Sequence, residues 1–158
     1  MYTIGILESG SGLSAFLAAH LPPHLLDRAD LCPAGSLAPG EVLDLLVVSP
    51  DWKGEKARAC PCRAMLVPGR LAEEAGGLSA GWAVSFGISP KDSLTLSSLG
   101  EETILLALQR EIITLTGQRL DPQEFSLARR GHTAPCHVMA CVGVQLLLGI
   151  EPGEVSLG

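Results

Sequence analysis

The chain has 158 residues, of which 47% are hydrophobic and 18% are charged, and its formal net charge is -6. This length and composition predict a single folded domain with a hydrophobic core, and they exclude an intrinsically disordered chain. The acidic balance and an aromatic content of 4% argue against nucleic acid as a partner. No apolar run is long enough to cross a membrane, and five cysteines, an odd number, favour reduced thiols. We therefore expect a cytoplasmic protein that binds neither nucleic acid nor membrane.

The first segment predicts a strand, a glycine-containing loop and a helix. Residues 2–7 are apolar, the run breaks at residues 9–12, and residues 13–21 continue as an apolar segment that Pro22 stops. Backbone N–H groups at a helix N-terminus suit a phosphate, although Glu8 beside them would repel an anion. The alternative is a tight turn that uses glycine only for its backbone freedom. The candidate residues for binding a phosphate or a nucleotide are Ser9, Gly10, Ser11, Gly12 and Ser14.

The next segments predict further strands of a parallel sheet. A weak strand ends near Cys32, and the apolar, β-branched runs 42–50, 63–69 and 82–88 are typical of strands buried on both faces. A helix of about two turns is expected between the last two runs. Residues 1–88 therefore predict a Rossmann-like α/β unit with a mostly parallel sheet.

The pattern changes after Ile88. Short apolar runs with β-branched residues and repeated breaks predict a small antiparallel meander over residues 89–130, and a helix over residues 102–115 is the rival interpretation. Residues 131–158 predict a C-terminal helix and a tail. Thr133 is the expected N-cap, Gly149 the expected stop, and the helix is apolar nearly all round, so we expect it to be buried.

This order of segments resembles one stretch of the central ATPase domain of the Mur ligase superfamily. The strand ending in Phe86-Gly87, the antiparallel segment, Gly131-His132 and the helix closing on residues 148–150 occur in the family's order. The resemblance implies a bacterial protein whose first loop stands where the family has its ATP-binding loop. It also places His132 at the family's histidine motif. Arg130 beside it has the charge to meet a carboxylate or phosphate, with a solvated turn as the alternative, so Arg130 and His132 are a possible secondary binding site.

One departure from the family concerns the chemistry. An ATP-binding loop of this type needs a lysine followed by serine or threonine, and this chain has Gly12-Leu13-Ser14 there. Without the lysine, ATP cleavage loses a main source of charge stabilisation. We therefore expect a degenerate, truncated relative of that domain that acts as a non-catalytic binding or assembly module. The alternative is a small enzyme or sensor that binds a nucleotide or phosphorylated ligand at the loop of Ser9 to Ser14.

Two other groups of side chains, the His/Cys pairs near the C-terminal helix and the aromatic residues of one strand, favour packing. His132 and Cys136 form one pair spaced by four and His137 and Cys141 form another, but the pairs are offset by about 100° around a helix, so we expect core packing and no metal site. Trp82 falls on the same side of a strand as Val84 and Phe86, which predicts core or interface packing. Together with the high apolar content, this favours a homo-oligomer or a protein partner.

Overall fold

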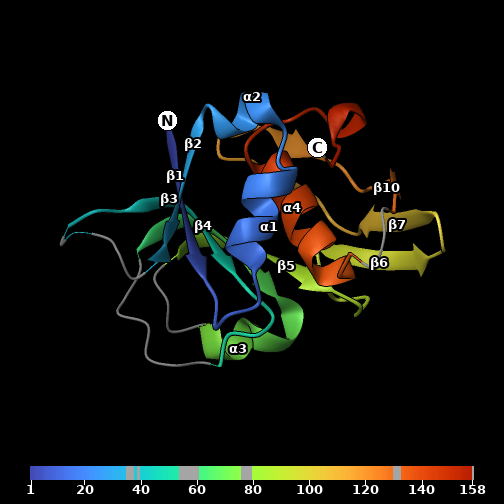
Figure 1. Ribbon diagram of the computed structural model, residues 1–158, viewed down its shortest axis with the longest axis horizontal. Coiled ribbons are helices and arrows are strands. Elements are labelled where there is room, and N and C mark those ends of the chain that lie inside the picture. The colour runs from blue at the N-terminus through green and yellow to red at the C-terminus, as the bar shows by residue number, and fades with distance from the viewer. Residues whose placement is uncertain (35–37, 39, 54–60, 76–79, 130–132, 158) are drawn as a thin grey trace.

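The structure is a computed structural model of the whole chain, and it describes all residues except 35–37, 39, 54–60, 76–79, 130–132 and 158. Its main feature is an eight-stranded sheet in the order β10-β7-β6-β5-β4-β3-β1-β2 (Figure 1). The strands from β2 to β5 pair in parallel. This confirms the predicted Rossmann-like α/β fold. The parallel strands are β1 (Tyr2–Leu7), β2 (Ala29–Pro33), β3 (Leu43–Val48), β4 (Cys62–Pro68) and β5 (Ala80–Gly87).

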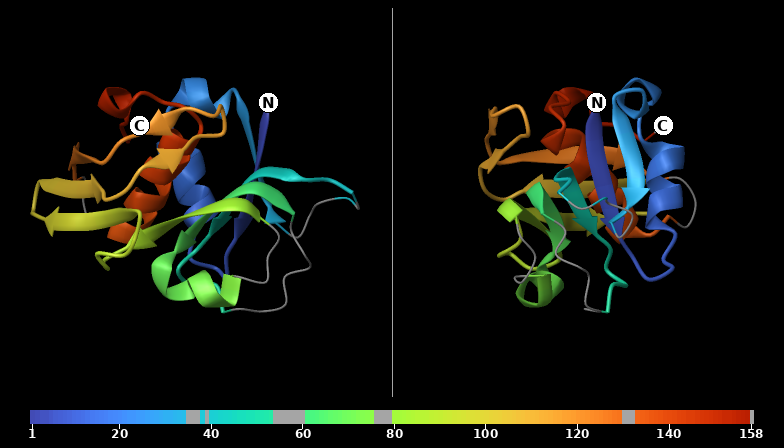
Figure 2. Two further views of the ribbon diagram at one scale, coloured as in Figure 1. Left: turned by 180° about the vertical axis from the view of Figure 1, so that it is seen from behind. Right: turned by 90° about the vertical axis from the view of Figure 1, so that its left-hand side faces the viewer.

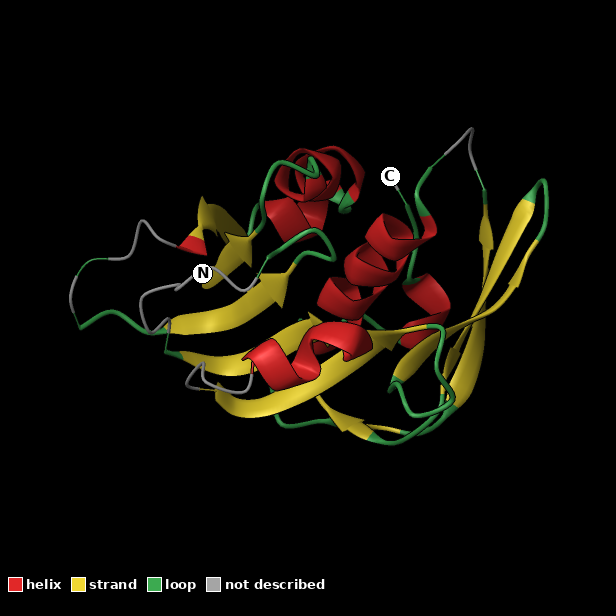
Figure 3. Cartoon of the chain, turned by 90° about the horizontal axis from the view of Figure 1, so that it is seen from below, coloured by secondary structure: helices red, strands yellow, loops and turns green. Residues whose placement is uncertain are grey.

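The antiparallel strands continue the same sheet. β6 (Leu94–Leu99) pairs in parallel with the end of β5 and antiparallel with β7 (Thr103–Leu108), and β7 pairs antiparallel with β10 (Gln123–Ala128). Figures 2 and 3 show these strands reaching away from the parallel part. The predicted meander is therefore confirmed in β6, β7 and β10.

The segment between β7 and β10 forms a separate hairpin. β8 (Ile112–Ile113) pairs antiparallel with β9 (Arg119–Leu120). The rival prediction of a helix over residues 102–115 is wrong, because β7 and β8 occupy that range. Ile104 on β7 is buried in the core, where a β-branched side chain packs well on a pleated surface.

Helices cover the two faces of the sheet unequally. α1 (Leu13–His20) and α4 (Pro135–Leu147) lie side by side on one face (Figure 1), where they bury the larger hydrophobic cluster. α2 (Pro23–Leu26) connects α1 to β2. The predicted helix after β4 is a 3-10 turn, η2 (Gly69–Leu71), followed by α3 (Ala72–Ala75), and its Leu71 and Ala75 join the second cluster. A last 3-10 turn, η3 (Pro152–Glu154), precedes the C-terminus.

The ends of α4 test two predictions. The N-cap is Ala134, so the predicted cap at Thr133 is wrong by one residue. Pro135 sets this start, because proline fits the first helical position, where its missing N–H is not needed. The predicted stop at Gly149 is confirmed: Gly149 has φ 90° and donates to Leu146, and Ile150 donates to Gln145, as in a Schellman motif. The helix is buried from Val138 onward, as predicted.

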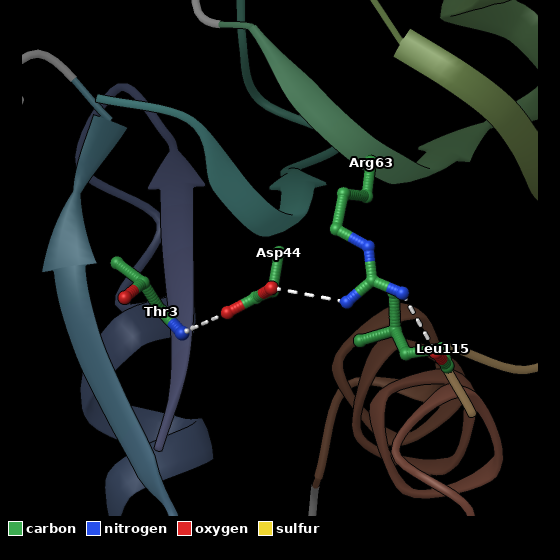
Figure 4. Close-up of polar contacts among 4 residues, drawn as sticks. All are labelled: Thr3, Asp44, Arg63 and Leu115. Carbon is green, nitrogen blue, oxygen red and sulfur yellow. Dashed lines mark hydrogen bonds and ion pairs between the residues drawn. The ribbon is translucent and has the colours of Figure 1, made fainter. Parts of the chain in front are cut away.

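A polar tether joins strands at the amino end of the sheet (Figure 4). The Asp44 carboxylate on β3 accepts the Thr3 N–H of β1 at 2.9 Å and contacts the Arg63 guanidinium of β4 at 3.2 Å. Arg63 also donates to the Leu115 carbonyl oxygen at 2.8 Å. These hydrogen bonds hold the segment after β8 against the sheet. The candidate site lies at the other end of the strands, beyond their carboxyl ends.

Candidate functional site

The strand order reverses direction at β1, which lies between β2 and β3. Ligands of open α/β sheets bind beyond the carboxyl ends of the strands at such a switch point. The loops that follow β1 and β3 meet here. Ser11 and Ser49 share a hydroxyl hydrogen bond of 2.8 Å, and the Ser9 N–H donates to the Asp51 carboxylate at 3.1 Å. The contact between these two loops therefore positions the candidate site.

A carboxylate of the protein lies at the N-terminus of α1. Gly12 is the N-cap, in the left-handed conformation with φ 80°, and it has no side chain with which to cap the helix. Glu8 does so instead: it accepts the Ser14 hydroxyl at 2.6 Å, the Ser14 N–H at 3.3 Å and the Ser11 hydroxyl at 3.2 Å. A negative charge at a helix N-terminus is stabilising. The donors that would bind a phosphate at Ser11 and Ser14 are thus taken up by Glu8.

The first residue of α1, Leu13, points into the core. Leu13 is 0% exposed and packs in the larger hydrophobic cluster with Leu17. A side chain at this position therefore leads away from the loop. Among the described residues, the two ion pairs are Arg63 with Asp44 and Arg119 with Glu111, and neither involves the loop.

Two further ionisable groups lie at the switch point. Burial alone would raise the pKa of Asp51, but the nearby hydroxyls of Ser49 and Ser11 and the Ser9 N–H outweigh it and lower the pKa below its ordinary value. On α4, burial lowers the pKa of His137, although the charges of Glu8 and Asp51 oppose this shift. Two carboxylates, Glu8 and Asp51, therefore lie near an imidazole whose lowered pKa favours its neutral form.

The structure brings together the residues predicted for the loop. Ser9, Ser11 and Ser14 all hydrogen-bond to Glu8 or Asp51. Gly10 has φ 104° and, like Gly12, requires glycine for its backbone conformation. Anion binding at this loop stays a prediction.

The predicted secondary residues, Arg130 and His132, lie outside the described residues. The cysteines of α4 have different surroundings. Cys141 is fully buried and burial raises its pKa to about 12, so its thiol is protonated at neutral pH. Cys136, near the start of the helix, lines a cavity.

Sequence reasoning missed that cavity, which has a volume of about 530 Å³ and adjoins the switch point through Pro50. Its residues come from four segments far apart in the sequence, including Phe86 on β5 and Met139 on α4. The only local signal was a glycine at the carboxyl end of two strands, Gly69 after β4 and Gly87 at the end of β5. Neither glycine alone indicates a cavity.

Comparisons with protein-family models, with curated proteins and with solved structures gave no match. In the part of the chain that the structure describes, no helix is long and apolar enough to span a membrane.

Proposed function

We propose that this chain is a non-catalytic binding or assembly domain that resembles the central domain of Mur ligases and does not cleave ATP. The observation that carries the proposal is the Glu8 carboxylate at the N-terminus of α1, hydrogen-bonded to Ser14 and Ser11. A triphosphate at this loop would have to displace Glu8 and would meet the negative charge of Asp51 as well.

The buried Leu13 supports the same proposal. Phosphoryl transfer depends on cations that neutralise charge developing on the phosphate oxygens. The position that supplies this cation in an ATP-binding loop carries an apolar side chain that is 0% exposed. The charges at the switch point, with Glu8 and Asp51 both negative, are unsuited to phosphate.

The test is MgATP turnover by the purified protein, together with calorimetric titration of MgATP. We expect no turnover above the spontaneous rate and no heat of binding in the micromolar range. Gly12→Trp is the comparison variant: it places a bulky side chain where the backbone φ of 80° suits glycine, so it should disrupt the loop. Turnover, or micromolar binding that Gly12→Trp abolishes, would overturn the proposal.

A second candidate function is favoured by the position of the loop at the switch point. A small enzyme or sensor could bind a nucleotide or sugar phosphate over Ser9 to Ser14 after Glu8 swings away. A thermal shift screen separates the two candidates. A rise of several degrees with one class of phosphorylated ligand, lost in Gly12→Trp, supports this second function, and no shift supports the first.

A further inference from the structure

The cavity beside the switch point has mostly apolar walls and a charged rim. The cavity has a volume of about 530 Å³, and its apolar lining includes Pro50, Phe86 and Met139. Two exposed cations, Arg70 and Lys91, also line it. The Arg70 guanidinium donates to the Pro50 carbonyl oxygen, which fixes it between the ends of β4 and β3. A cavity of this size and character is typical of a site for a small molecule.

A buried carboxylate also lines the cavity. Asp92 is 5% exposed, and its Oδ2 accepts the Ser89 N–H at 3.2 Å. No described residue donates a hydrogen bond to Oδ1 of Asp92. Two side-chain atoms of the described residues are fully buried without a partner, Asp51 Oδ1 and Arg129 Nε. Oδ1 of Asp92 is not one of them, so this unpartnered atom keeps some accessible surface.

Two glycines make room for this carboxylate. A Cβ at Gly69 would collide with Asp92 Oδ1, and a Cβ at Gly87 would lie 2.5 Å from Oδ2. The turn after β4 and the end of β5 thus close around the Asp92 side chain, and any larger residue at either position would displace it. The carboxylate is held in place at the cavity and keeps one acceptor atom unused.

An unused acceptor in an apolar environment is unfavourable unless a donor pairs with it. Because Oδ1 keeps accessible surface, a bound molecule can reach it. An apolar molecule bearing an N–H donor fits both the apolar walls and the carboxylate.

We propose that this cavity binds a small apolar molecule through an amino group that donates to Oδ1 of Asp92. Arg70 and Lys91 at the rim strengthen binding when the same molecule carries an acidic group, as an apolar amino acid does. This goes beyond the proposed function of the loop, because neither Glu8 nor Asp51 is needed for it.

Calorimetric titration with three related probes tests the chemistry. The probes are phenethylamine, which has only the amine, 3-phenylpropanoate, which has only the acid, and L-phenylalanine, which has both. We expect phenethylamine and L-phenylalanine to bind at least about tenfold more tightly than 3-phenylpropanoate. In Asp92→Asn, which keeps the shape of the side chain, binding of both amines should weaken by about tenfold or more. The exposed Asp30→Asn is the matched control and should bind as the wild type does.

Alkylation of the unmodified protein by iodoacetamide gives a readout that needs no variant. Cys136 lines the cavity, so a bound amine should slow its alkylation about fivefold near saturation, as followed by peptide mass spectrometry. Cys32 on β2 does not line this cavity and should react at an unchanged rate. The proposal is overturned if neither amine binds or protects Cys136 at about 10 mM, if 3-phenylpropanoate acts equally well, or if Asp92→Asn binds the amines unchanged. Each of these outcomes leaves the ATP measurement unaffected, so the two proposals fail separately.

Discussion

At the scale of single residues, Leu13 and Glu8 decide what the first loop can do. The Leu13 side chain at the start of α1 is buried in the core. Glu8 accepts the Ser14 N–H and hydroxyl. Leu13 provides no cation and Glu8 supplies an anion, so both residues disfavour phosphate.

Restoring the lysine should therefore destabilise the protein and give no activity. Leu13→Lys buries an ammonium group without a partner, which we expect to lower the free energy of unfolding by about 3 kcal/mol or more. Urea denaturation measures this change. Leu13→Met, which keeps the apolar volume, should cost less than about 1.5 kcal/mol. Equal stability of Leu13→Lys and wild type would show that this position does not point into the core.

Glu8 should act as the cap of α1. Glu8→Ala removes the acceptor of the Ser14 N–H and hydroxyl, and we expect the free energy of unfolding to fall by about 1 kcal/mol. The exposed Glu101→Ala is the control and should change stability by less than about 0.5 kcal/mol. If both variants unfold at the same urea concentration, Glu8 is not a cap.

At the scale of elements, the sequence predicted the strongly patterned segments well. The runs that became β3 and β4 are apolar after Asp44 and Arg63 near their amino ends, and this pattern is typical of parallel strands buried on both faces. β2 gave only a weak signal, because an edge strand with half-exposed and exposed positions needs little apolar sequence. The separate hairpin of β8 and β9 has two residues in each strand, which is too short for any periodicity to mark.

The site was predictable only in outline. The glycine loop between strand and helix is visible in the sequence, and so is the absence of lysine. The contact between Ser9 and Asp51 spans 42 positions, and Asp92, just before β6, reaches Gly69, just after β4, so no local pattern could indicate either. Gly69 and Gly87 are explained by the close approach of their backbone to the Asp92 carboxylate, which only the fold reveals.

The C-terminal tail should depend on one buried side chain of α4. Gln145, 0% exposed, donates to the Ser156 carbonyl oxygen at 2.7 Å and accepts the Ser156 N–H at 3.0 Å. Gln145→Leu removes both hydrogen bonds, so we expect the Ser156 N–H to exchange with solvent at least about tenfold faster and stability to fall by about 1 kcal/mol. The exposed Gln118→Leu is the control. Unchanged exchange at Ser156 in Gln145→Leu would contradict this role.

At the scale of the whole molecule, the switch point couples the loops of the sheet to α4. Glu8 in the loop after β1 and Asp51 in the turn after β3 lie close enough to His137 on α4 for their charges to act on it. The homo-oligomer or protein partner expected from the apolar content stays a prediction. Burial of His137 at this point makes stability depend on pH.

Stability should fall as the pH drops below 6.5, and His137 should cause part of the loss. Its pKa in the folded protein is lower than the ordinary value of 6.5, so the unfolded chain takes up the proton first and is favoured as the pH falls from 6.5 toward the folded pKa. His137→Gln should lose stability less steeply between about pH 7.5 and pH 5.5 in urea denaturation. The exposed His24→Gln should behave as the wild type does. The pKa of Asp51 is lowered, so its carboxylate stabilises the folded protein at neutral pH, and this contribution is lost in a separate window as the pH falls below 3.8. Parallel pH profiles for wild type and His137→Gln would contradict the assignment.

The Glu8 carboxylate lies at the N-terminus of α1, where a bound phosphate would need the same donors. A crystal structure of the protein grown with MgATP tests whether Glu8 stays there. We expect no triphosphate over residues 9–14, with the Glu8 carboxylate within hydrogen-bond distance of the Ser14 N–H and hydroxyl, as it is here at 3.3 Å and 2.6 Å. A triphosphate bound at that loop, with Glu8 turned away and a cationic side chain beside the terminal phosphate, would contradict it.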